Sequence, residues 1–313
     1  MTLSAGAYSR AQPSPKVIGF LSPYSSPDAE ATLSVFRQAM RDLGYVEGKN
    51  FVLAVRSANG KNERLLALAA ELVQLRVDLI LASTTNAVKA AQAATSAIPI
   101  VFESVADPVT AGFAESISHP GHNITGQSNF SADLSPKRFQ FLTQTLPSLS
   151  RVAVLANPSN AYYPAQKPVI ESVAERLGLR VQFVGAGTAE EVDLAFETMV
   201  ERRAEAVIAT ADAYLYALRR RIAELALKNR LPSMFPFAAY VEAGGLMSYG
   251  VDPALGIRQT SILVDKIFKG ARAGDLPIEQ PTRVELVINR RTAALLRLTI
   301  PKALLLQAEK VID

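Results

Sequence analysis

The sequence contains no cysteine and no tryptophan, and its only histidines are His119 and His122. The absence of cysteine excludes disulfide bonds, thiolate nucleophiles and cysteine-ligated zinc. A Ser-His-Asp triad or a multi-histidine metal site would have to use the one His-Pro-Gly-His segment, and a Pro-Gly pair is typical of a surface turn. We therefore expect no catalytic residue, no metal site and no cofactor.

Long apolar runs and a strong charge bias are also missing. The longest apolar stretches, such as residues 79–82, have the length of a strand, whereas a membrane-spanning helix needs about 20 apolar residues. The 33 Lys and Arg residues against 29 Asp and Glu residues leave a net charge of +4, spread over the whole chain. Because nucleic-acid binding requires a basic stripe or patch, we expect no nucleic-acid partner.

What the sequence does contain is a repeated α/β pattern. The 313 residues, 49% of them hydrophobic, suit two globular domains. Short apolar runs alternate with longer amphipathic segments, an order typical of a doubly wound parallel sheet. In the first unit we expect strands at 17–21, 51–55, 77–82 and 98–102, and helices at 29–43, 64–75 and 86–95.

The pattern then starts again. Strands are expected at 151–155, 181–184, 206–209 and 232–235, and helices at 166–177, 189–202 and 214–229. In each unit a glycine follows the first helix, Gly44 in the first unit and Gly178 in the second. The spacing from the first strand (position 18 or 152) to this glycine is the same in both units. The sequence therefore predicts two tandem copies of one α/β unit.

The last third of the chain does not repeat the unit a third time. It contains expected strands at 246–249 and 284–288, a helix at 256–268, a connection rich in Pro and Gly at 274–281, and an apolar end at 304–312. These elements must complete one lobe or the other, so the chain must cross between the lobes more than once. Two lobes joined by several crossings form a hinge around a cleft.

Candidate ligand-binding residues follow the strands, because ligands of doubly wound sheets bind beyond the carboxyl ends of the strands. Residues 83–86 open a helix, where backbone N–H groups attract an anion, although Ser, Thr and Asn are also ordinary helix caps. Asp212 and Asn157 would close on a ligand from the second lobe, while Asp107 could accept a hydrogen bond or only start a turn. Aromatic residues at the strand ends would form the walls of the ligand cleft, or would only pack within the protein. The full candidate set is Ser22, Tyr24, Ser83, Thr84, Thr85, Asn86, Asp107, Asn157, Tyr163, Asp212, Phe237 and Tyr249.

Nucleotide-binding signatures are absent from the sequence. No G-x-x-x-x-G-K-[ST] motif occurs, and the glycine pair Gly185 and Gly187 lacks the third glycine of a dinucleotide fingerprint.

Several longer segments together carry a family resemblance. They are residues 17–22 (VIGFLS), 97–102 (AIPIVF) leading to the Asp107-Pro108-Val109 segment, 120–126 (PGHNITG), 151–158 (RVAVLANP) and 241–250 (VEAGGLMSYG). From Val17 to Ile312 the chain resembles the substrate-binding proteins of ABC transporters, in the bacterial family that includes tryptophan- and tyrosine-type binding proteins.

The resemblance implies a type I periplasmic-binding fold, with two flavodoxin-like lobes and a three-crossover hinge. By position, the crossovers fall near residues 128–131, 249–252 and 280–283, so one lobe would comprise 16–128 and 252–280 and the other 129–251 and 281–313. The family is exported, although residues 1–15 contain neither a hydrophobic signal nor a lipobox cysteine. We expect a periplasmic or exported protein with a longer natural start or a removed signal.

The function that follows is capture of a small solute, an amino acid or another small aromatic or carboxylate-bearing molecule, by a monomer that delivers it to a membrane permease. A ligand sensor that feeds a receptor would have the same fold and cleft. An enzyme of the doubly wound class is a further alternative, for which the sequence offers no catalytic or cofactor-binding motif. A DNA-binding regulator would need a helix-turn-helix before the first strand, where about 16 residues are too few.

Overall fold

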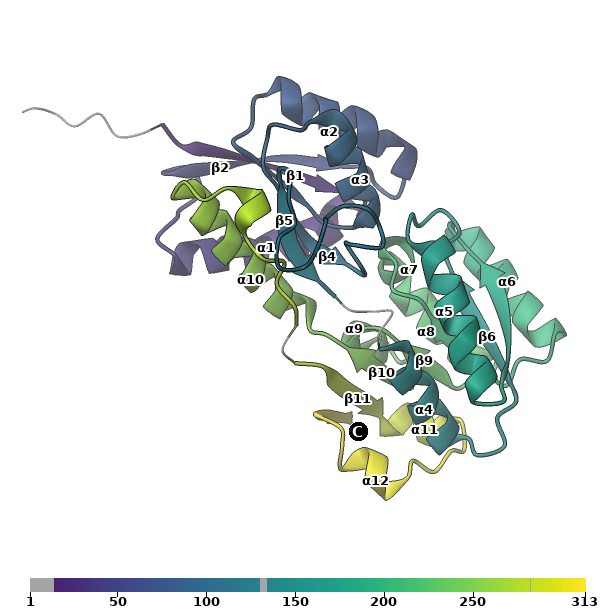
Figure 1. Cartoon of the computed structure of the whole chain (residues 1–313). Coiled ribbons are helices and arrows are strands. Elements are labelled where there is room, and N and C mark those ends of the chain that lie inside the picture. Colours follow the sequence, from purple (N-terminus) through teal and green to yellow (C-terminus); the bar gives the residue numbers. More distant parts are fainter. Residues whose placement is uncertain (1–13, 130–133, 282) are drawn as a thin grey trace, which may run out of the picture.

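The computed structural model describes residues 14–129, 134–281 and 283–313 and contains two β-sheets with helices on both faces (Figure 1). The first sheet has the order β2-β1-β3-β4-β5, and its strand pairs are all parallel. Its strands are β1 (Lys16–Ser22), β2 (Phe51–Ser57), β3 (Leu79–Ala82), β4 (Ile100–Val105) and β5 (Ile124–Ser128).

The second sheet repeats this order and extends it. Read from its β7 edge, the order is β7-β6-β8-β9-β10, followed by β11 and β12. Its strands are β6 (Arg151–Ala156), β7 (Arg180–Gly185), β8 (Ala206–Ala209), β9 (Ser233–Phe235), β10 (Met247–Gly250), β11 (Glu285–Asn289) and β12 (Lys310–Ile312). Only the β10–β11 pair is antiparallel among the described strand pairs of this sheet. The predicted α/β class with two doubly wound sheets is therefore confirmed.

Amphipathic helices cover both faces of the first sheet. On α1 (Ser26–Asp42), Leu33, Phe36 and Met40 recur at three- and four-residue spacing and are buried. They share one core with Ile257 and Val264 of α10 (Pro253–Phe268), a helix from the last third of the chain. The other face packs against α2 (Leu65–Gln74), which follows the short 3-10 helix η1 (Asn62–Arg64), and against α3 (Thr85–Ala94).

The second sheet is covered in the same way. One face carries α4 (Ser135–Thr145), α5 (Tyr163–Arg176), α11 (Arg290–Leu295) and α12 (Lys302–Leu305). The other face carries α6 (Ala189–Glu201), α7 (Ala213–Ala217), α8 (Arg219–Lys228) and α9 (Ala238–Glu242). We call each sheet with its covering helices a lobe: the first lobe contains β1–β5, and the second contains β6–β12.

The chain passes between the lobes three times. It leaves the first lobe after β5, returns after β10 to form α10 and the 3-10 helix η2 (Ala273–Asp275), and enters the second lobe again at β11 (Figure 1). The segments before the first and third passages lie side by side, since the Ser128 backbone N–H donates to the Glu279 carbonyl over 3.0 Å. The predicted crossovers near 128–131 and 280–283 fall partly on residues 130–133 and 282, outside the described residues.

Several elements differ from the sequence-based expectations. The expected helix at 214–229 is two helices, α7 and α8, and β5 and α4 had no counterpart. The β5 strand has only one aliphatic residue, Ile124, yet all five of its residues are buried, and the Thr125 hydroxyl donates to the Leu276 carbonyl over 2.8 Å. Such a strand is stabilised by tertiary hydrogen bonds rather than by an apolar pattern, so periodicity could not reveal it.

None of the helices that the structure describes combines the length and hydrophobicity needed to cross a lipid bilayer.

Candidate functional site

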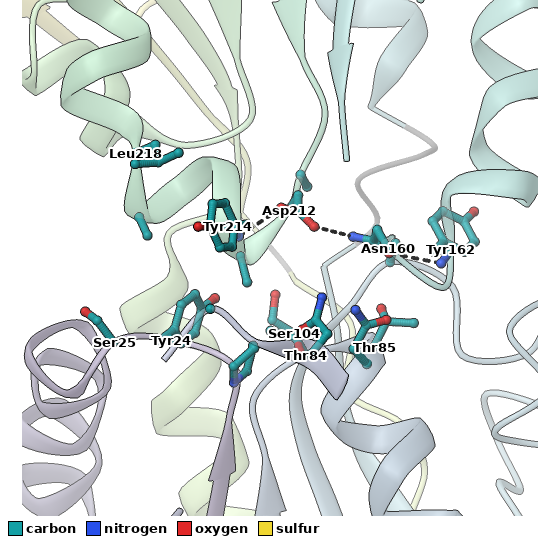
Figure 2. A pocket seen from close by; sticks show the side chains of 18 of the residues that line it. Tyr24, Ser25, Thr84, Thr85, Ser104, Asn160, Tyr162, Asp212, Tyr214 and Leu218 are labelled. Carbon is teal, nitrogen blue, oxygen red and sulfur yellow. Dashed lines mark hydrogen bonds between the residues drawn. The ribbon is translucent and has the colours of Figure 1, made fainter. Parts of the chain in front are cut away.

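A cavity of about 180 Å3 lies between the lobes, at the carboxyl ends of both sheets. Figure 2 shows Tyr24, Thr84, Thr85 and Ser104 of the first lobe facing Asn160, Asp212 and Tyr214 of the second lobe across the open space. The strand order changes direction at β1 and β3 in one sheet and at β6 and β8 in the other, and ligands of such sheets bind at these switch points. The cavity therefore occupies the position where the fold favours a ligand.

The first lobe contributes the beginning of helix α3. Thr84 is the N-cap residue, with its hydroxyl accepting from the Ala87 backbone N–H at 3.5 Å, and Thr84, Thr85 and Asn86 all line the cavity. The first N–H groups of a helix have no partner within the helix, and the helix dipole places partial positive charge there. This wall of the cavity suits a carboxylate or another anionic group.

The second lobe contributes Asp212, which follows β8 and is the N-cap residue of α7. Its carboxylate is buried, with 8% of the residue exposed. Burial raises the pKa of Asp212 above its ordinary value, although the hydrogen bonds that the carboxylate accepts act in the opposite direction. A buried carboxylate at the wall of a ligand-sized cavity is suited to pair with a cationic donor.

The two oxygens of the Asp212 carboxylate are unequally occupied. Oδ1 accepts from the backbone N–H groups of Tyr214 (2.8 Å) and Leu215 (3.0 Å) and from Asn157 Nδ2 (3.2 Å). Oδ2 accepts from Asn160 Nδ2 at 2.9 Å. Because an ionised carboxylate offers about four lone-pair sites, two on each oxygen, Oδ2 retains capacity for one more donor.

Loop residues keep the Asp212 carboxylate in place. The side-chain amide oxygen of Asn157 accepts from the Ser159 backbone N–H at 2.9 Å. The side-chain amide oxygen of Asn160 accepts from the Tyr162 backbone N–H at 2.9 Å (Figure 2). Both asparagine side chains are thus held by their own loop while they donate to Asp212. A carboxylate held in this way is preorganised for a ligand.

The two lobes also touch directly beside the cavity. Asn86 Nδ2 donates to the Ser159 carbonyl over 3.2 Å, and Asn86 Oδ1 accepts from the Ala161 backbone N–H at 2.9 Å. The rings of Tyr24 and Tyr216 meet edge to face, with their centroids 6.3 Å apart. These contacts hold the lobes close together over the cavity.

The expected site residues divide between the cavity wall and its surroundings. Ser22 is buried and its Oγ accepts from the Tyr24 backbone N–H at 3.1 Å, so it shapes the loop. Ser83 is buried behind the wall, and Asn157 acts through Asp212, as described above. The expected residues that line the cavity are Tyr24, Thr84, Thr85, Asn86, Asp212 and Phe237.

Three other expected residues make local contacts away from the cavity lining. Asp107 Oδ1 accepts from the N–H groups two and three residues further along the chain, so its carboxylate caps a turn. Tyr163 packs edge to face against Phe183, and Tyr249 packs in the same way against Phe141. The aromatic rings at these two positions stabilise the second lobe.

The cavity wall also includes residues that were not among the candidates. Ser104 lies near the end of β4, and Asn160 and Tyr162 follow β6, so all three carried the same signal as the chosen residues. Asn129 instead comes from a passage between lobes, which only the tertiary structure reveals. The polar and aromatic additions are Ser25, Asn59, Asn62, Ser104, Asn129, Asn160, Tyr162 and Tyr214.

The chemistry of the cavity is that of binding. Among the described residues that line it, hydroxyl and amide groups, aromatic rings and one carboxylate occur, without Lys, Arg or His. The described part of the chain also contains no group of three His, Cys, Asp or Glu residues placed to hold a metal. The arrangement can hold a small molecule through directed hydrogen bonds and aromatic contacts.

Comparison with known proteins gives consistent matches over most of the chain. The model of the family described as ABC transporter substrate binding protein matches residues 17–312. A tyrosine-binding protein of Clostridioides difficile strain R20291 is 27% identical over 279 residues, which cover 88% of this chain and 79% of that protein.

Solved structures match as well. A conserved domain protein from Vibrio cholerae has a TM-score of 0.89 at 26% identity, covering 95% of this chain and 99% of that one. A Streptococcus pneumonia ABC domain in complex with L-Trp has a TM-score of 0.88 at 22% identity, covering 96% and 100%. A ligand-free, open substrate binding protein from Clostridium difficile has a TM-score of 0.67 at 24% identity, covering 95% and 99%. These matches show that the chain shares the fold of these proteins over nearly its whole length.

Proposed function

Because this chain belongs to the ABC transporter substrate binding protein family, and thus captures a solute for an ABC importer, we propose that its ligand is an α-amino acid with an aromatic side chain. The amino acid lies in the cavity between the lobes, with its carboxylate at the start of α3 and its ammonium group at Asp212. The lobes close over it, and no covalent step occurs. The protein works outside the cytoplasmic membrane and delivers its ligand to the membrane permease of the transporter.

The observation that carries the proposal is the unequal occupation of the Asp212 carboxylate. Among the described residues, Oδ1 accepts three hydrogen bonds and Oδ2 accepts one, so an ammonium donor can still pair with Oδ2. The opposite wall is the N-terminal end of α3, which suits a carboxylate. A molecule with an ammonium and a carboxylate group on the same carbon atom, as in an α-amino acid, matches both walls.

The other walls favour an aromatic side chain. Tyr24, Tyr162, Tyr214 and Phe237 line the cavity, and aromatic rings pack well against such residues. A named tyrosine-binding relative and a structural relative solved with L-Trp support the same ligand class. Micromolar binding requires about −8 kcal/mol, which a few charge-assisted hydrogen bonds and a buried ring supply.

We assign residues 16–128 and 252–280 to the first lobe and residues 129–251 and 281–313 to the second as the units that move on closure. This division follows the sheets, since α10 packs on the first sheet and β11 joins the second. The contacts of Asn86 with the backbone of the opposite lobe support a closed arrangement in the present structure.

The experiment is isothermal titration calorimetry of tyrosine, tryptophan and phenylalanine with the wild type and with Asp212→Asn. The substitution retains an oxygen that can cap α7 but removes the negative charge. Loss of one charge-assisted hydrogen bond costs roughly 1.5–3 kcal/mol, so we expect affinity to fall roughly 10- to 150-fold.

Asp107→Asn is the matched control, because Asp107 also caps a turn through its carboxylate but lies outside the cavity lining. We expect this variant to bind like the wild type. Tyramine, which lacks the carboxylate of tyrosine, is expected to bind weakly to every variant. Unchanged affinity of Asp212→Asn, or no binding of any aromatic amino acid to the wild type, would refute the proposed ligand.

A further inference from the structure

A second, smaller cavity of about 70 Å3 adjoins the main one. Tyr24, Ser104 and Phe237 line both cavities, so these three side chains form their common boundary. The smaller cavity extends from this boundary toward α1 and α10 of the first lobe, where Thr32 and Ile257 line it. A ligand that fills the main cavity can therefore extend into a second compartment.

Glu103 of β4 supplies the one ionisable carboxyl among the described residues that line this compartment. Side chains alternate across a strand, so Glu103 lies on the same face as Val101, which belongs to the apolar core beneath α1 and α10. The Glu103 carboxyl thus lies on the face of β4 that packs into an apolar core through Val101.

The Glu103 carboxyl is buried and unsatisfied. Only 7% of the residue is exposed, and its Oε2 has no hydrogen-bond partner among the described residues. Burial raises the pKa of Glu103 to about 8. Buried polar atoms in proteins are nearly always hydrogen-bonded, and the described residues offer this carboxyl oxygen no partner, so a ligand in the adjoining cavity is suited to supply one.

Aromatic side chains flank the path to this carboxyl. Tyr216 meets Tyr24 edge to face at 6.3 Å between centroids and meets Phe237 at 5.7 Å, and all three line the smaller cavity. Tyr24 comes from the first lobe and the other two from the second, so the enclosure is complete only when the lobes are together. A flat ring or a slender cationic chain passing between these rings would end at Glu103.

We infer that Glu103 forms the distal end of the ligand site and selects ligands whose side chain ends in a hydrogen-bond donor. The inference rests on the proposed function, because it assumes that the amino-acid end of the ligand is held in the main cavity. The donor is a phenolic hydroxyl or a terminal ammonium group, and either would satisfy the carboxyl. A purely apolar side chain would leave Oε2 without a partner and would bind more weakly.

The test compares pairs of ligands that differ only in the terminal donor. Calorimetry with the wild type measures tyrosine against phenylalanine and lysine against norleucine, and the ratio of dissociation constants within each pair is the readout. We expect the donor-bearing member of at least one pair to bind roughly tenfold more tightly or better, the value of one well-formed buried hydrogen bond.

Two variants then separate the possible donors. Glu103→Leu removes both acceptor oxygens, and we expect it to bring the ratio to about one. Glu103→Gln keeps an acceptor oxygen but cannot ionise beside an ammonium group, so it should preserve a preference for the phenol and abolish one for the ammonium. Glu115→Gln, an exposed acid outside both cavities, is the matched control and should keep the wild-type ratio.

Failure of this inference is distinguishable from failure of the proposed function. The role of Glu103 is overturned if the wild type binds both members of each pair equally, or if Glu103→Leu leaves the ratio of dissociation constants unchanged. Neither result would contradict the proposal that the ligand is an amino acid. If no aromatic amino acid binds, the proposed function fails. The role of Glu103 is then decided by the ratio for 3-(4-hydroxyphenyl)propionate against 3-phenylpropionate, two acids that lack the ammonium group. No binding of these acids either would overturn both.

Discussion

Closure of the lobes brings Gly60 of the first lobe against Tyr214 of the second, and the substitution Gly60→Ala tests whether binding depends on that closure. Gly60 has φ +81°, and a Cβ atom added there would lie 2.7 Å from Cε2 of the Tyr214 ring. The methyl group therefore meets the opposite lobe only when the lobes are together. An open form would accommodate it.

The magnitude follows from two contributions. Placing an alanine in the left-handed region costs about 1–2 kcal/mol of folding stability, whatever the state of the lobes. Displacing the Tyr214 ring from its rotamer costs about 0.5–1.5 kcal/mol, and this second cost falls on the closed state alone. We therefore expect ligand affinity to fall roughly two- to twelvefold.

Gly48→Ala isolates the first contribution. Gly48 has φ +80°, almost the same as Gly60, but a Cβ atom there meets nothing within 4 Å. Urea unfolding of the ligand-free proteins should show similar losses of stability for the two variants, and calorimetry should show weaker tyrosine binding for Gly60→Ala alone. Equal affinities in the two variants would refute the reasoning that this contact forms on closure.

Two further predictions concern side chains at the cavities. Asn86→Ala removes the two interlobe hydrogen bonds with Ser159 and Ala161, worth about 0.5–1.5 kcal/mol each. Calorimetry should therefore show roughly 5- to 150-fold weaker ligand binding, and unchanged affinity would mean that these bonds add nothing to closure. Burial raises the pKa of Glu103 to about 8, whereas the unfolded chain has a value of about 4.3. Between these pH values the Glu103 carboxyl is protonated in the folded protein and ionised in the unfolded chain, so the free energy of unfolding falls as the pH rises. Urea unfolding between about pH 4.3 and pH 8 should show the free energy of unfolding falling less steeply with pH for Glu103→Leu than for the wild type, by at most about 1.4 kcal/mol per pH unit. The same pH dependence in both proteins would contradict the raised pKa of Glu103.

Much of the fold could be predicted because its signals are local. Buried parallel strands such as β1 and β6 are short apolar runs, and amphipathic helices such as α1 show their buried face at three- and four-residue spacing. The repetition of these signals along the chain predicts two sheets without knowledge of any contact. The β5 strand was missed because the buried hydroxyl groups of Thr125 and Ser128 donate to carbonyls of segments distant in sequence.

The sequence predicted where the cavity lies in the fold better than it predicted which residues line it. Strand ends identify the loops that approach the cavity, and Asp212 was found in this way. Tyr162 lines the cavity while its neighbour Tyr163 packs on Phe183, because adjacent residues at the start of a helix point in different directions. Which of two such neighbours faces the ligand depends on how the helix sits on its sheet.

The apolar periodicity of this chain by itself determined the α/β class, the tandem units and the edge of each sheet where a ligand would lie, since these depend on neighbours a few residues apart. Tertiary structure decided the rest. The strand expected to end at residue 102 continues as β4 to Val105, and this extension places Glu103 on a buried face instead of in a loop. Whether this carboxyl is solvated or enclosed depends on elements such as α10, more than a hundred residues away in sequence, and on the other lobe. A local sequence pattern carries no information about such distant neighbours.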